Sequence, residues 1–348
     1  MAEGLSSIGL LMAGATSVSN VVKDMAAKKV VDRHDLVAST FCIRFFTALV
    51  FVATVAARGM MGVVPVVRDG GALFGIASLH LAALLTYSIY LGIDVALVVC
   101  STLLYYRAIQ LTPISLCMPY ISFTPVFLIV TGYVINGETT TATKGIGVIL
   151  ICIGSIAMHR RLFAQGWIEP IKAIWRERGC FFMLLAAVIN AITNPIEKKL
   201  VLMADAFTQA CAFGVGLFGM FALLYALRRA SAGTVLRAVP GWTVLAGVLE
   251  AAGLLFQLSS HNHIAVVYTI SIKRAGIVLV ILVGWLVFKE RGIGDKLIAA
   301  SVMVVGVLIL YLPVTLSQGI TLGAGALAAM AFAFYLTRRA TKLVEAVS

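Results

Sequence analysis

Two adjacent basic residues lie inside an apolar segment, where a charge is costly. Lys273 and Arg274 occur in the run SIKRAG, about ten residues into the apolar segment 264–288. At the centre of a bilayer each charge costs at least about 2.5–3.5 kcal/mol, and the two also repel each other. Arginine presents a planar fork that suits phosphate or carboxylate, while lysine acts as a point charge. The pair predicts an anion-binding site, and a structural ion pair with a carboxylate is the alternative.

Two carboxylates occupy the middle of other apolar segments. Asp94 lies in the segment 80–107 and Glu250 in the segment 242–262. Either carboxylate could serve as a counter-ion to Lys273 and Arg274. A buried carboxylate can also bind and release a proton, so proton coupling is the second interpretation.

Other polar residues in apolar segments are candidates with a structural alternative. Arg44 either lines a cavity or forms a structural pair, and Lys198 can extend its ammonium to the interface. Asn20 and Asn190 either bond a substrate or link neighbouring helices. Substrate binding or aromatic packing is expected of Tyr120 and Tyr268.

Several kinds of chemistry have no sequence support. His261 and His263 are two residues apart and do not share a helix face, so no metal site is expected. The six cysteines are scattered singly and match neither a disulfide framework nor a metal spacing. The sequence has no nucleotide-binding loop, no nucleophile-and-base motif and no HExxH. We therefore predict that the protein is not an enzyme and needs no cofactor.

The composition indicates that these residues are positioned by membrane helices. Hydrophobic residues make up 61% of the 348 residues and charged residues only 12%. A soluble domain of this length could not bury so much apolar surface, whereas a bilayer can. A spanning helix needs about 20 apolar residues. We predict ten spans, at 5–25, 37–57, 80–107, 112–134, 142–158, 180–203, 205–227, 242–262, 264–288 and 295–315.

The predicted fold is therefore an all-α integral membrane protein with ten transmembrane helices. A further apolar run at 320–337 is either an eleventh span or a helix lying on the membrane. The predicted units are a first repeat at 1–158, a linker at 159–179, a second repeat at 180–315, and a C-terminal segment with a basic tail at 316–348.

Internal repetition supports the division into two halves. A shift of 152 residues aligns Gly132, Glu138, Lys144 and Gly154 with Gly284, Glu290, Lys296 and Gly306. A shift of 170 residues aligns Asn20, Lys28 and Lys29 with Asn190, Lys198 and Lys199. The structural interpretation of the shared pattern is a glycine for close helix packing and a glutamate at a helix start facing water. Because each unit has five spans, the second unit must be inverted, which places a substrate near the midplane.

The distribution of basic residues predicts the orientation. With an eleventh crossing, 18 Lys and Arg follow odd-numbered spans and five follow even-numbered ones. The positive-inside rule then predicts an outside N-terminus and a cytoplasmic C-terminus. The same rule accounts for the net charge of +12 without a nucleic-acid partner.

The residues at 94–158 resemble an EamA-type unit of the drug/metabolite transporter superfamily. The resemblance lies in YYRAIQLTPISLCMPYISFTPVFLIVTGYVINGETTTATKGIGVILICIGSIAM and, in the second half, in FKERGIGDKLIAASVMVVGVLIL. It covers most of residues 5–315 and implies the ten-helix fold and a transport activity. The common arrangement in the superfamily has both termini in the cytoplasm, so the orientation stays open between the two predictions.

Two patches resemble the triose-phosphate and sugar-phosphate translocator branch. These are SIKRAG, with Lys273 and Arg274, and NPIEKKL, with Lys198 and Lys199. The resemblance implies that Lys273, Arg274 and Lys198 bind the phosphate of a substrate.

The leading hypothesis is a secondary active transporter of a small anionic metabolite, phosphorylated substrates included, that works by alternating access. The alternatives are an exporter of amino acids or amphipathic drugs, and a flippase for a phosphate-headed lipid. The expected partners are a small-molecule substrate and the lipid bilayer, with monomer and homodimer both open. The expected location is a bacterial inner (plasma) membrane.

Overall fold

The structure, a computed structural model, describes most of the predicted spans. Described are residues 6–31, 34–60, 80–112, 117, 120–157, 175–228, 232–276, 278 and 294–347. Within these ranges the regular structure is entirely α-helical. Most of the predicted linker 159–179 and the second part of the predicted ninth span, including 279–288, lie outside the described residues.

The described helices follow the order of the predicted spans. They are α1 (Ser7–Val31), α2 (Leu36–Met60), α3 (His80–Leu111), α5 (Thr124–Asn136), α6 (Ala142–Ala157), α8 (Arg178–Met203), α9 (Ala206–Arg228), α10 (Ala232–Ala238), α11 (Pro240–His261), α12 (Val266–Ala275), α14 (Gly294–Tyr311) and α15 (Leu316–Val347).

Several of these helices are long and apolar enough to cross a membrane. Among the described residues six candidate spans meet both criteria, and they lie in α2, α3, α8, α9, α11 and α15. Shorter apolar helices lie at Thr124–Asn136, Ala142–Ala157 and Leu297–Tyr311. The prediction of an all-α, multi-pass membrane protein is confirmed, while the count of ten spans stays a prediction.

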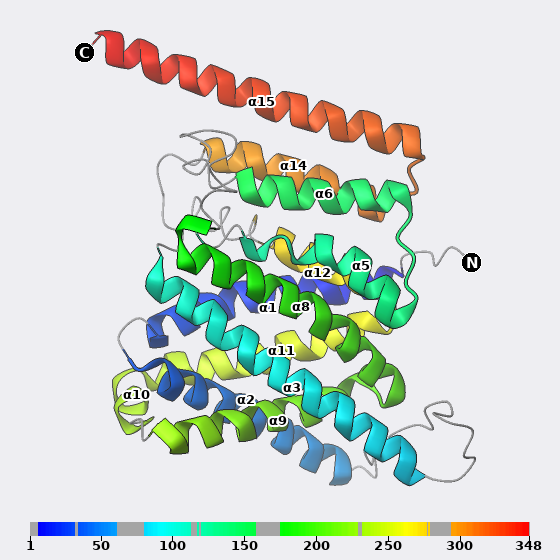
Figure 1. Ribbon diagram of the computed structural model, residues 1–348, viewed down its shortest axis with the longest axis vertical. Coiled ribbons are helices and arrows are strands. Elements are labelled where there is room, and N and C mark those ends of the chain that lie inside the picture. The colour runs from blue at the N-terminus through cyan, green and yellow to red at the C-terminus, as the bar shows by residue number, and fades with distance from the viewer. Residues whose placement is uncertain are drawn as a thin grey trace.

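In the predicted fourth span, 112–134, residues 113–116 and 118–119 lie outside the described residues, and Cys117, Tyr120 and Ile121 are helical. Helix α5 begins only at Thr124, after Phe123 as the N-cap residue, with Pro125 in its first turn. Proline lacks a backbone N–H and is tolerated where that group has no helical partner. The C-terminal run predicted at 320–337 lies in α15, whose candidate span covers Leu316–Tyr335. Figure 1 shows α15 running alongside α14 and α6 at one edge of the molecule.

Helices of the two halves pack against each other in a reciprocal pattern. Helix α1 packs against α11, and its counterpart α8 packs against α3 (Figure 1). At the first interface Asn20 approaches Gly253, and at the second Asn190 accepts a hydrogen bond from Ser101. Gly253 and Ser101 are separated by the repeat shift of 152 residues. The helices that surround the midplane are therefore contributed by both halves.

Helices α6 and α14 cross at two glycine contacts. A Cβ on Gly147 would lie 2.8 Å from the Gly306 carbonyl oxygen, and a Cβ on Gly154 would lie 2.8 Å from that of Ala299. Because higher numbers in α6 meet lower numbers in α14, the two helices are antiparallel. Small residues allow helix backbones in a membrane to approach this closely.

Two other helix contacts use backbone carbonyl groups that have no donor within their own helix. Pro195 interrupts α8 and leaves the Ala191 carbonyl without its helical donor. The Thr131 hydroxyl of α5 donates to that carbonyl at 2.5 Å. Likewise Lys144 Nζ donates to the carbonyl oxygens of Ile309, Leu310 and Leu312 at the C-terminal end of α14. Such carbonyls have no intrahelical donor, and a cation there is favoured by the helix dipole.

The glycine crossing leads to a prediction about stability. Gly147→Ala should lower the thermal unfolding midpoint of the purified protein in detergent, because the new methyl group collides with the α14 backbone. Overpacking of this kind costs about 1–3 kcal/mol. The matched control is Gly145→Ala in the same helix, where a Cβ meets nothing within 4 Å. If both variants unfold at the same temperature, the close contact between α6 and α14 is wrong.

Candidate functional site

The two basic residues of the SIKRAG run lie in the last turn of α12. Their helix end is fixed to the middle of α1, because Ser17 Oγ donates to the carbonyl oxygens of Ile272 at 2.8 Å and Lys273 at 3.2 Å. Ser17 lies near the midpoint of the 25-residue α1. Lys273 and Arg274 are thus held at the depth of the centre of α1, as the sequence predicts.

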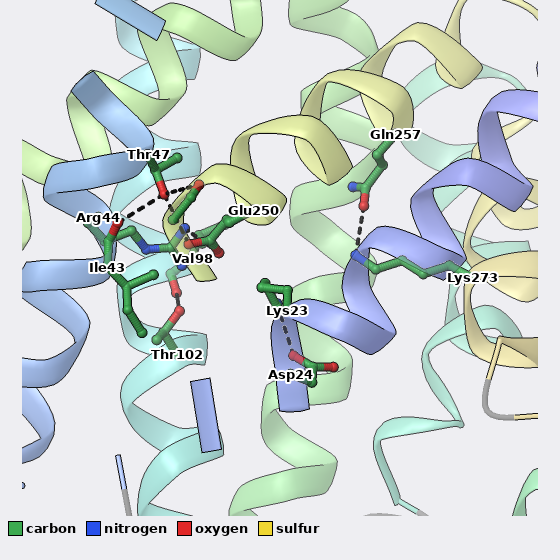
Figure 2. A network of polar contacts seen from close by, with 11 residues as sticks. Lys23, Asp24, Ile43, Arg44, Thr47, Val98, Thr102, Glu250, Gln257 and Lys273 are labelled. Carbon is green, nitrogen blue, oxygen red and sulfur yellow. Dashed lines mark hydrogen bonds and ion pairs between the residues drawn. The ribbon is translucent and has the colours of Figure 1, made fainter. Parts of the chain in front are cut away.

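Lys273 begins a chain of buried polar groups that joins three helices. Its Nζ donates to Gln257 Oε1 of α11 at 2.7 Å (Figure 2). The Gln257 Nε2 donates to Glu197 Oε2 of α8 at 2.9 Å and to Asn194 Oδ1 at 3.1 Å. Gln257, Glu197 and Asn194 are all buried. We call Lys273, Gln257, Glu197 and Asn194 the polar chain.

Arg274 and Lys273 lack a direct carboxylate partner in the part of the chain that the structure describes. The Nε atom of Arg274 is buried and has no hydrogen-bond partner there. Lys23 of α1 adds a third positive charge that interacts electrostatically with Lys273. Its own partner is the neighbouring Asp24, at 3.1 Å. The centre of the bundle therefore contains more positive than negative charge around α1 and α12.

Asp24 is an exposed acid near this centre. Its side chain is 66% exposed although it lies within α1, which packs against α11 and α12. Figure 2 shows Lys23 and Asp24 between the Arg44–Glu250 pair and the Lys273–Gln257 bond. Adjacent positions on a helix do not face each other, so the long side chain of Lys23 has to turn back to reach the Asp24 carboxylate.

Glu250 is the counter-ion of Arg44 and does not pair with the SIKRAG residues. Arg44 Nη1 lies 2.7 Å from Glu250 Oε1, and both side chains are nearly buried. Thr47 Oγ1 also donates to Glu250 Oε2 at 3.4 Å. Of the two interpretations of Arg44, the structure therefore has the ion pair, and the expectation that Glu250 neutralises Lys273 or Arg274 is wrong.

Asp94 is completely buried in α3 at the interface with α8. Neither of its carboxylate oxygens has a hydrogen-bond partner among the described residues. Its strongest charged neighbour is Glu197, another acid. The alternative of Asp94 as a counter-ion to the basic pair therefore lacks a contact here.

Lys198 is paired with a glutamate of the repeated motif. Its Nζ lies 2.7 Å from Glu138 Oε1 and donates to the Ile264 carbonyl oxygen at 3.2 Å. Glu138 Oε2 accepts the Val266 N–H at 3.0 Å and so caps the N-terminus of α12. The Glu138 side chain is only 11% exposed, so the prediction that this glutamate faces water is wrong. The charges of Lys198 and Glu138 neutralise each other at this end of the bundle.

Of the two predicted asparagines, Asn190 links two helices, whereas Asn20 bonds within its own helix. Asn190 Oδ1 accepts the Ser101 hydroxyl at 2.7 Å, and Asn20 Nδ2 donates to the Thr16 carbonyl oxygen at 2.8 Å within α1. Tyr120 is 2% exposed and Tyr268 is 8% exposed. Both tyrosines belong to clusters of buried apolar side chains and not to a ligand-facing wall.

Sequence reasoning missed Glu197, Gln257 and Asn194 as members of the site. Glu197 stands in the quoted run NPIEKKL, where the two lysines drew attention. A carboxylate or amide inside an apolar span is itself a signal of a buried polar contact. That signal could have identified Glu197 and Gln257, but not which groups they contact.

A cavity of about 750 Å³ opens at the end of the bundle where α1 and α9 end and α2 and α8 begin. It is lined by His34, Asp35, Leu36, Cys100, Leu103, Leu104, Arg107, Phe182 and Arg228. The opposite end holds the Glu138–Lys198 pair and a tight contact of Gly9 with His263 and Ile264. Over the described ranges no three His, Cys, Asp or Glu residues lie close enough to hold a metal ion.

The Arg44–Glu250 pair generates a prediction by a double-mutant cycle. Arg44→Met should lower the thermal unfolding midpoint strongly, because it leaves Glu250 buried and unpaired; breaking a buried pair costs about 3–5 kcal/mol. Adding Glu250→Gln should recover most of this loss, since the remaining groups are neutral. A double variant that is less stable than Arg44→Met alone would show that the two side chains are not coupled.

Comparison with known proteins agrees with the helical arrangement. The model of the EamA-like transporter family matches residues 7–159, which cover α1 to α6. A solved structure, titled only as the crystal structure of a protein, has a TM-score of 0.65 at 14% identity, over 87% of this chain and 96% of its own. At that identity the likeness shows a shared fold and nothing more. A comparison with curated proteins finds no match.

The match and the apolar helices together support an integral, multi-pass membrane protein that transports small molecules. EamA-like family members are transporters, which agrees with the prediction that the protein is not an enzyme. The resemblance predicted for the first half of the chain is thus confirmed as a match to the EamA-like transporter family over residues 7–159.

Proposed function

We propose that the protein is a secondary active transporter that moves a small anionic metabolite by alternating access. The observation that carries this proposal is the position of Lys273 and Arg274 at mid-depth without a carboxylate partner in the described structure. Basic groups left unpaired inside a membrane are costly and typically mark a substrate path. A bound anion would supply the missing negative charge.

The chemistry of the site favours an oxyanion. The guanidinium of Arg274 can bind two oxygens of a phosphate or carboxylate at once, and the ammonium of Lys273 adds an orientable charge. Lys23 contributes to the same positive field. Phosphorylated metabolites and dicarboxylates both fit this field, because each carries up to two negative charges on oxygens that a guanidinium can bind.

Alternating access is supported by the packing of the two halves. The reciprocal α1–α11 and α8–α3 contacts, and the antiparallel crossing of α6 and α14, are what two inverted five-helix repeats would produce. One end of the bundle is held together by the Glu138–Lys198 pair, and the other end contains the cavity. We interpret this as a state open to one side, with the substrate site between the halves.

The alternative substrates gain less support from the same residues. An exporter of amphipathic drugs would need an aromatic cavity with its basic pair neutralised by Glu250. Tyr120 and Tyr268 are instead packed in apolar clusters, and Glu250 binds Arg44. A lipid flippase, the bacterial inner membrane as the location, and the choice between monomer and homodimer have no specific observation in their favour.

Transport by substituted variants tests the anion site. Lys273→Gln and Arg274→Gln should each reduce uptake of the transported anion into liposomes by about tenfold or more, because a charge-assisted hydrogen bond contributes about 1.5–3 kcal/mol. The probes are radiolabelled inorganic phosphate, three- and six-carbon sugar phosphates, a dicarboxylate, and leucine as the neutral comparison.

Lys29→Gln is the matched control, because Lys29 is an exposed lysine of α1 outside the site. Uptake of the anions by this variant should equal that of the unchanged protein. Transport of leucine alone, or anion uptake that survives both site substitutions, would refute the proposed function.

Labelling of Cys100 tests the orientation. Cys100 lines the cavity and is the exposed one of the six cysteines. The charge count predicts that this end faces the cytoplasm. A membrane-impermeant maleimide should therefore label the protein in inside-out vesicles and not in right-side-out vesicles. Cys100→Ser should abolish the labelling, and labelling confined to right-side-out vesicles would reverse the predicted orientation.

A further inference from the structure

Asp94 is a buried acid with no neighbouring group, among the described residues, that would stabilise a negative charge on its carboxylate. The residue is 0% exposed, and both of its oxygens lack a hydrogen-bond partner in the described structure. The buried cluster that α3 and α8 form in this part of their interface is mainly apolar and includes Leu91, Ile196 and Leu200. An unpaired carboxylate in such a site costs several kcal/mol unless it is neutralised.

A second buried acid makes this cost larger. Glu197 of α8 is 5% exposed. Helices α3 and α8 are antiparallel, with Gly179 against Thr112 and Asn190 bonded to Ser101, and the same register places Glu197 opposite Asp94. Two carboxylates that share a site in a low-dielectric interior cannot both keep their charge without a cation between them. The choice is therefore between a bound metal ion and a proton.

The donor set favours the proton. Ions such as Ca²⁺ and Mg²⁺ require about six to eight oxygen ligands, whereas the cluster between α3 and α8 in this region is mainly hydrocarbon. The described residues contain no group of three metal-ligating side chains. A proton needs only one carboxylate oxygen and leaves a neutral carboxylic acid beside a single negative charge.

We infer that Asp94 and Glu197 form a proton-binding pair that couples proton movement to anion transport through the polar chain. The coupling half of this inference rests on the proposed function, and the proton-binding half does not. Proton binding adds one proton to a carboxylate oxygen of the pair, and no bond of the substrate is made or broken.

The orientation of Gln257 connects the pair to the substrate site. Its amide N–H donates to Glu197 while its carbonyl oxygen accepts from Lys273. The Gln257 amide therefore bridges the Glu197 carboxylate and the Lys273 ammonium. When the pair is fully ionised, the added negative charge holds Lys273 in the polar chain. When a proton binds, this attraction weakens and the ammonium can turn toward an anion. Proton and anion therefore bind together, which predicts symport.

Other titratable or charged groups lie on the helices around the pair. Helix α3 contributes Tyr87, whose hydroxyl donates to Gln209 of α9. Helix α12 contributes Lys273, and Glu138, which follows α5, is paired with Lys198 next to Glu197 in the chain. Helix α11 contributes His261, a fully buried imidazole without hydrogen-bond partners in the described structure. A readout specific for carboxylic acids is needed to separate the pair from His261.

Infrared difference spectroscopy of the full chain in lipid vesicles provides that readout. Spectra are compared between two pH values above the titration range of exposed carboxylates. The unchanged protein should show the C=O stretching band of a protonated carboxylic acid. The band should be lost or shifted in Asp94→Asn and in Glu197→Gln, and retained in Glu177→Gln at the N-cap of the same α8. Using two variants guards against misfolding of one.

Transport into liposomes tests the coupling. For an anion that the unchanged protein carries, an inward proton gradient should drive its accumulation. Glu197→Gln should lower this accumulation by about tenfold or more, the effect of about 1.4 kcal/mol, while exchange of labelled for unlabelled anion without a gradient continues. Glu177→Gln should accumulate the anion normally.

The outcomes are distinguishable. A carboxylic acid band that is missing from the unchanged protein, or that persists in both site variants, overturns the proton-binding pair. If the band behaves as expected but the proton gradient does not drive accumulation of the anion, the coupling is overturned. If the unchanged protein carries none of the anions, the proposed function fails, and the infrared result still decides whether Asp94 and Glu197 share a proton.

Discussion

The low dielectric of the membrane interior requires each buried charge to find its partner inside the helix bundle. Arg44 meets Glu250 between α2 and α11, and Lys198 meets Glu138 between α8 and α5. These pairs join helices that are far apart in the sequence, so they fix how the helices pack. The charges that remain without such a partner are the ones available for transport.

Close helix packing fixes the positions of the residues that make these contacts. Glycines bring the backbones of α6 and α14 together, and Thr131 and Lys144 satisfy carbonyl groups that a proline and a helix end leave free. Ser17 fixes the end of α12 to the middle of α1. The basic pair is thus held at mid-depth by hydrogen bonds of its own backbone, while the Lys273 ammonium bonds to Gln257 and the Arg274 Nε has no hydrogen-bond partner in the described structure.

The two ends of the bundle differ in a way that suits a carrier. At one end the carboxylate of Glu138 both caps α12 and binds Lys198, so separating the halves there breaks an ion pair and a helix cap together. At the other end the cavity reaches Cys100 and Arg107, and Asp24 is exposed within α1. The two ends therefore differ in charge, with a neutralised pair at one end and a charged, open region at the other.

The sequence by itself determined the helical membrane fold and the residues that bear charge within it, because apolar length and composition are local properties of the chain. It located Lys273 and Arg274, but it left the partner of Glu250 open and passed over Glu197 and Gln257. Only the tertiary structure decided which charges meet, because ion pairs such as Arg44–Glu250 join residues on different helices, whose packing depends on glycine contacts and freed carbonyls throughout the bundle.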